Sequence, residues 1–103
     1  MAYRLDRRVA VLEFDEQELH GTEVRCKVDV PMWILLDVQA SLSNGEIQRG
    51  IDLFSERVLV GWTIEEDGEA IPANVEGMRE LPISIALRIV GAWLKAAIEL
   101  PLA

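Results

Sequence analysis

Cysteine, histidine and positive charge are all scarce in this sequence. The 103 residues contain one cysteine, Cys26, and one histidine, His20. A single cysteine excludes an internal disulfide framework and a multi-cysteine zinc site, and it fits a reducing compartment. Lys and Arg number 10 against 18 Asp and Glu, which gives a formal net charge of −8. Because so acidic a chain repels phosphate backbones and anionic lipids, we expect neither nucleic acid nor a membrane as its partner.

The sequence also lacks a long uninterrupted apolar run. Its longest apolar stretch, Pro82 to Ile98, carries Arg88 and Lys95 and is shorter than the roughly 18–20 residues that a membrane-spanning helix needs. Met1 to Arg8 contains no apolar segment typical of a signal peptide. Half of the residues are nonetheless hydrophobic, which is enough for a packed core. We therefore predict one soluble, intracellular domain over residues 1–103, with a flexible segment at residues 1–7.

No motif for catalysis or cofactor binding is present. The glycines match neither a P-loop nor a dinucleotide fingerprint, and there is no G-x-S-x-G sequence. The acidic group Glu65-Glu66-Asp67 with Glu69 lacks the spacing of a calcium-binding loop and indicates a solvated hairpin tip. His20 precedes Gly21 in a polar segment, which favours a solvated loop residue over a general base. We predict no catalytic residue, cofactor or metal, and an interaction protein rather than an enzyme.

The first part of the chain predicts an antiparallel β-hairpin. Val9 to Phe14 is short and rich in β-formers, and in Glu23 to Val30 apolar and charged residues alternate. This period of two predicts a strand with one buried and one solvated face. The polar segment Asp15 to Thr22 would join the two strands. Cys26 falls in the inward phase, which favours core packing over a reactive thiol.

Two helices and a second small hairpin are predicted next. Pro31 suits the first turn of a helix over Met32 to Leu42, which is apolar on several sides and ends at the break Ser43-Asn44-Gly45. Glu46 to Val58 has one apolar face at helical spacing, so the two helices would form a hairpin. Asp67-Gly68 is a favoured two-residue turn, which predicts a small β-hairpin or an extended loop within Val60 to Ile71.

A last helix, from Pro82 to Glu99, follows one helical turn at Val75 to Arg79. The fold class is thus α+β: a β-hairpin, a helical hairpin, a short β-turn segment and a long apolar C-terminal helix. Because the polar residues of this last helix form one narrow stripe, most of its circumference needs cover. Such a surplus of apolar surface favours a partner chain or self-association.

The three tryptophans are anchors either of the core or of an interface. The core is the favoured interpretation for Trp62 and Trp93, whereas Trp33 near a helix start is open to both. We predict that the contact face of the protein includes Ile85, Ile89 and Trp93 on the last helix, with Trp33 as a further candidate.

The order of the turns and apolar segments resembles the tail assembly chaperones of long-tailed bacteriophages and prophages. The resemblance covers roughly residues 9 to 102 and depends on these segments: Leu12-Glu13-Phe14, Leu19-His20-Gly21, the strand Glu23 to Val30, Val60-Gly61-Trp62-Thr63-Ile64, Asp67-Gly68, Ile71-Pro72-Ala73, Glu76-Gly77, Leu81-Pro82 and Ile89-Val90-Gly91-Ala92-Trp93. Each segment alone has low specificity, and their order and spacing carry the similarity.

The resemblance implies a non-enzymatic α+β protein of the infected bacterial cytoplasm that is absent from the finished virion. Such chaperones are thought to bind the tape-measure protein and keep it soluble until tail-tube subunits polymerise around it. The partners implied are therefore the tape-measure and tail-tube proteins. Many members also have a longer form made by ribosomal frameshifting, and the extra domain of such a product is not in this chain.

Two other classes of protein stay open at this point. A structural virion component, such as a minor tail or head–tail joining protein, would share the size and fold but would remain in purified particles. A small cytosolic enzyme or metal-dependent regulator would need His20 or the acidic group at residues 65–69 to act. Whether the function survives the replacement of His20 by Ala tests this class.

Overall fold

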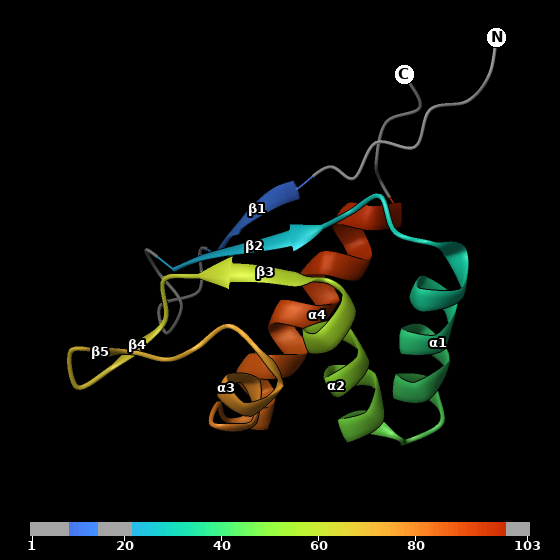
Figure 1. Cartoon of the computed structure of the whole chain (residues 1–103). Helices are drawn as coiled ribbons and strands as arrows, with labels where there is room; N and C mark the ends of the chain where they lie inside the picture. Colours follow the sequence, from blue (N-terminus) through green and yellow to red (C-terminus); the bar gives the residue numbers. More distant parts are fainter. Residues whose placement is uncertain (1–8, 15–21, 99–103) are drawn as a thin grey trace, which may run out of the picture.

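A three-stranded antiparallel sheet lies over a group of helices in the computed structural model of the chain, which describes residues 9–14 and 22–98 (Figure 1). The sheet contains β1 (Val9–Glu13), β2 (Glu23–Lys27) and β3 (Leu59–Trp62) in the order β1-β2-β3. Strand β2 is central, and its inward residues Val24 and Cys26 are completely buried, as their alternation with charged residues predicts.

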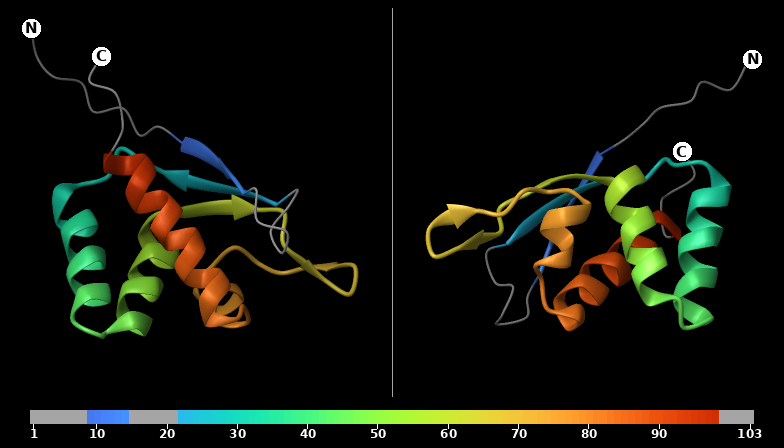
Figure 2. Two further views of the ribbon diagram at one scale, coloured as in Figure 1. Left: turned by 180° about the vertical axis from the view of Figure 1, so that it is seen from behind. Right: turned by 60° about the horizontal axis from the view of Figure 1, so that its bottom comes forward.

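Four helices pack below the sheet. They are α1 (Met32–Ser43), α2 (Ile47–Arg57), α3 (Val75–Arg79) and α4 (Ile83–Ile98). Helix α4 crosses beneath the strands, α2 lies beside it, and α1 forms the outer edge of the molecule (Figures 1 and 2). The helices cover one face of the sheet, and on the other face Val9 and Val11 are exposed.

The helical hairpin turns where the sequence predicts it to break. Gly45 takes a positive φ of 81°, a conformation that favours glycine. The N–H groups of Asn44 and Glu46 donate to the carbonyl oxygens of Ala40 and Ser41, and these bonds satisfy the last carbonyls of α1. The turn therefore brings α2 back against α1.

A second, two-stranded hairpin, β4 (Glu65–Glu66) and β5 (Glu69–Ala70), projects from the end of the molecule opposite α1 (Figures 1 and 2). Asp67 and Gly68 form its turn with φ values of 53° and 82°, as a two-residue turn with both central residues at positive φ requires. All residues of the two strands and the turn are exposed.

The core is one cluster between the sheet, α2 and α4. Its buried members are Leu12, Phe14, Val24, Cys26, Val28, Ile34, Val38, Ile51, Phe54, Val58, Met78, Ala86, Ile89, Val90 and Trp93. Phe54 and Trp93 meet at its centre, with ring centroids 5.4 Å apart and planes tilted by 57°.

The predicted α+β class and the order of its elements are confirmed: a β-hairpin, two helices, short strands and a C-terminal helix. Most boundaries agree with the prediction to within one residue, and two differences are larger. The second strand ends at Lys27 instead of Val30. The segment around Trp62 joins the main sheet as β3, so the second hairpin contains only Glu65–Glu66 and Glu69–Ala70. Among the described residues, no helix combines the length and the apolarity that crossing a membrane requires.

Candidate functional site

Two of the four predicted contact residues lie in the core. Ile89 and Trp93 have 0% of their surface exposed, and Ile85 is only partly exposed. The prediction of a contact face over Ile85, Ile89 and Trp93 is therefore wrong for Ile89 and Trp93. The physical reason is that α4 packs its side chains Ala86, Ile89, Val90 and Trp93 into the core, whereas Ile83 and Ile98 near its two ends stay exposed.

Three of the exposed large apolar side chains lie together on α1 instead. Met32, Trp33 and Leu36 expose 73%, 53% and 52% of their surface, while Ile34 and Val38 on the opposite side of the same helix enter the core. Leu36 lies four residues after Met32 and three after Trp33, and residues at these spacings are neighbours on a helix surface. The three exposed side chains therefore form one patch, here called the α1 face.

The edge position of α1 explains this exposure. The helix packs along α2, and none of the other helices formed by the described residues lies on its far side (Figure 1). Trp33, the fourth predicted contact residue, is thus at the surface. The prediction missed Met32 and Leu36, although the segment from Met32 to Leu42 is apolar on several sides and a helix at the edge of a fold cannot bury all of them.

A pocket of about 340 Å³, here called the cationic pocket, adjoins the α1 face. It is lined by Lys27, Val30, Pro31, Trp33, Ile34, Glu56 and Arg57. The guanidinium carbon of Arg57 lies 6.0 Å from the centre of the Trp33 ring, within the range of a cation–π interaction. Within the described part of the chain, neither Lys27 nor Arg57 forms an ion pair. The pocket therefore combines an apolar wall with two cations and a single carboxylate, Glu56.

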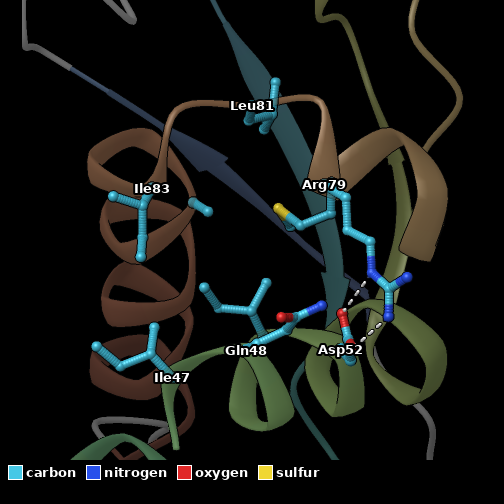
Figure 3. Close-up of a pocket in the computed structure, with 9 residues that line it drawn as sticks. Ile47, Gln48, Asp52, Arg79, Leu81 and Ile83 are labelled. Carbon is cyan, nitrogen blue, oxygen red and sulfur yellow. Dashed lines mark hydrogen bonds and ion pairs between the residues drawn. The ribbon is translucent and has the colours of Figure 1, made fainter. Parts of the chain in front are cut away.

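A second pocket, of about 280 Å³, opens between α2, the α3–α4 turn and the start of α4 (Figure 3). Ile51, Met78 and Ala86 form its buried floor, and Ile83 is exposed at its rim. Two hydrogen bonds, of 2.7 and 3.3 Å, join the Arg79 guanidinium to the Asp52 carboxylate and raise the pKa of Arg79. Because these two charges satisfy each other, this pocket offers apolar surface and no free charge.

Of the other residues considered in the sequence, Cys26 and Trp62 lie within the described structure and His20 does not. Cys26 is completely buried, and burial raises the pKa of its thiol to about 12, so its predicted core role is confirmed and the thiolate nucleophile is suppressed. Trp62 is half-buried, and its indole N–H donates a 2.6 Å hydrogen bond to the carbonyl of Ile71. His20, its polar segment and residues 1–7 lie outside the described residues.

Across residues 9–14 and 22–98, no three His, Cys, Asp or Glu side chains are close enough together to hold a metal ion. The acidic group at residues 65–69 is exposed on the β4–β5 hairpin, as predicted for a solvated tip. Comparison with known protein families, curated proteins and solved structures finds no match for this chain.

Proposed function

We propose that this protein is a non-enzymatic tail assembly chaperone that binds the tape-measure protein of a long-tailed bacteriophage. The α1 face is the observation that carries the proposal. Three large apolar side chains, Met32, Trp33 and Leu36, are together on one helix and more than half exposed. Apolar patches of this kind, when rimmed by polar residues, mark protein interaction sites.

The chemistry of the α1 face suits an apolar, helical client. An amphipathic helix is recognised by apolar side chains at helical spacing. The large indole of Trp33 is typical of an interface anchor. The net charge of −8 would keep a complex with an apolar client soluble. In this proposal the chaperone acts in the host bacterial cytoplasm and leaves when tail-tube protein polymerises around the client.

Co-expression with the tape-measure and tail-tube proteins that neighbouring genes encode tests the proposal. We expect the tape-measure protein to be recovered as a soluble complex, sized by light scattering, that dissociates when tail-tube protein is added. The double variant Trp33→Glu and Leu36→Glu would place two charges in the α1 face and abolish recovery of the complex. Because both side chains are exposed, the variant should fold.

Gln48→Glu with Ser84→Glu is the matched control. It adds the same two charges at exposed positions of α2 and α4, away from the α1 face, and should leave the complex intact. Equal binding by both double variants would show that the client binds elsewhere. If the protein bound neither tail component, or if it stayed in purified particles, the chaperone function would be refuted; retention in particles would favour a structural tail component.

A further inference from the structure

The cationic pocket is electrostatically unusual in so acidic a protein. The chain has a net charge of −8, yet Lys27 and Arg57 face one pocket with a single carboxylate, Glu56, beside them. By contrast, Arg49 and Arg79 on the neighbouring helices already form ion pairs with carboxylates. The pocket is therefore a local positive site that a group of acidic side chains would match.

The β4–β5 hairpin carries such a group. Glu65, Glu66, Asp67 and Glu69 are all exposed there, and no ion pair joins any of them to another described residue. Glu66 pairs directly across from Glu69 in the ladder. Like charges in that position destabilise a hairpin, and a two-stranded hairpin has little stability to spare. A cationic partner would relieve this repulsion.

The hairpin and the pocket are at opposite ends of the molecule. In Figure 1 the hairpin projects at the left, whereas the ends of β2 and α2 and the start of α1, which line the pocket, are at the right. The reverse view in Figure 2 shows the same separation. Since the hairpin cannot reach the pocket of its own chain, any contact between them joins two molecules.

We propose that the β4–β5 hairpin of one copy docks into the cationic pocket of a second copy. The carboxylates of the hairpin would lie against Lys27 and Arg57, and the turn would pack on the exposed edge of Trp33. Such a contact uses two different surfaces, so each copy keeps one free hairpin and one free pocket, and further copies can add. This inference concerns the protein alone and does not depend on the proposed client.

Two charge-neutralised variants test the contact without touching the core. Lys27→Gln with Arg57→Gln removes the positive charge of the pocket, and Glu66→Gln with Glu69→Gln removes half of the negative charge of the hairpin; all four side chains are exposed. In sedimentation velocity at about 0.15 M salt, where the Debye length is about 8 Å, the average mass of the wild type should rise with concentration. Each variant alone should remain a monomer.

An equimolar mixture of the two variants is the decisive sample. The pocket variant keeps a native hairpin, and the hairpin variant keeps a native pocket, so one contact per pair is restored. The mixture should form a dimer and nothing larger, because the remaining hairpin and pocket of that dimer are both altered. A symmetric contact through one shared surface, or association through the α1 face, cannot give this result.

Matched variants control for net charge. Arg25→Gln with Lys95→Gln, and Glu76→Gln with Glu80→Gln, change exposed residues elsewhere by the same charge and should associate like the wild type. Three results would overturn the proposal: a wild type that stays monomeric up to about 1 mM, where even a contact with a Kd of 1 mM would form; variants that associate normally; or a mixture that stays monomeric.

Discussion

The indole N–H of Trp93 donates a 2.8 Å hydrogen bond to the backbone carbonyl oxygen of Lys27. This bond joins residues 66 positions apart and ties the second half of α4 to the end of β2. The same indole ring packs against Phe54 of α2. One side chain therefore connects the sheet with two helices, and a residue in this place serves the fold rather than a binding surface.

Trp93→Phe should lower the free energy of unfolding by about 1–3 kcal/mol, because it leaves a cavity and removes the hydrogen bond to Lys27. For a domain of this size each kcal/mol corresponds to about 4–8 °C in the melting temperature. Thermal unfolding followed by circular dichroism would measure the shift. Trp33→Phe is the control, since Trp33 is half-exposed and its replacement should change the melting temperature by only about 2 °C. Equal shifts would contradict the assigned roles.

Gly77→Ala should unfold or severely destabilise the protein. A Cβ atom at this position would collide with the carbonyl oxygen of Pro72, which is backbone and cannot move aside easily. We expect a loss of about 3 kcal/mol, measured by urea denaturation. Gly91→Ala is the matched control, because a Cβ there meets nothing within 4 Å and the position is in the middle of α4. Alanine at residue 91 should stabilise the protein by about 0.5–1 kcal/mol; a loss at both positions would refute this account.

Cys26 should make the protein less stable in alkaline solution. Its pKa is raised from 9.0 to about 12 in the folded state, so between these values the unfolded chain releases a proton that the folded chain keeps. The contribution of the buried, neutral thiol to the free energy of unfolding is complete below pH 9. It is lost as the pH rises toward 12, by about 1.4 kcal/mol per pH unit. Other groups titrate there too, so the measured quantity is the difference in unfolding free energy between the wild type and Cys26→Ala. That difference should shrink from pH 9 to pH 10.5, and a constant difference would show that the thiol is not shielded.

The sequence allowed the local structure to be predicted because short-range patterns determine it. Alternation in Glu23 to Val30 indicates the buried face of β2, and Asp67-Gly68 indicates the turn of the small hairpin. These features depend on neighbours in the chain, which the sequence displays directly.

The exposed surface could not be predicted in the same way, because it depends on which elements cover which. The last helix has more apolar side chains than α1, yet α4 crosses beneath the sheet and α1 is at the edge. Exposure at Met32 and Leu36 is therefore a property of the packing order. The pairing of β3 with β2 decides the place of Trp62 similarly, since residues about 40 positions apart meet there.

Trp62→Phe should loosen the β4–β5 hairpin selectively. The indole N–H of Trp62 and the N–H of Ile71, which donates to Ile64, hold the base of this hairpin with bonds of 2.6 and 3.0 Å. Loss of one hydrogen bond costs about 1 kcal/mol, so amide hydrogen exchange in the hairpin should accelerate about fivefold, while the amides of α4 change less. Thr63→Val is the control, because it removes a bond of 2.9 Å to the N–H of Glu23 on the neighbouring strand and leaves Ile71 untouched. Acceleration of the hairpin amides by Thr63→Val, or none by Trp62→Phe, would contradict the assignment of the indole as the clamp of the hairpin.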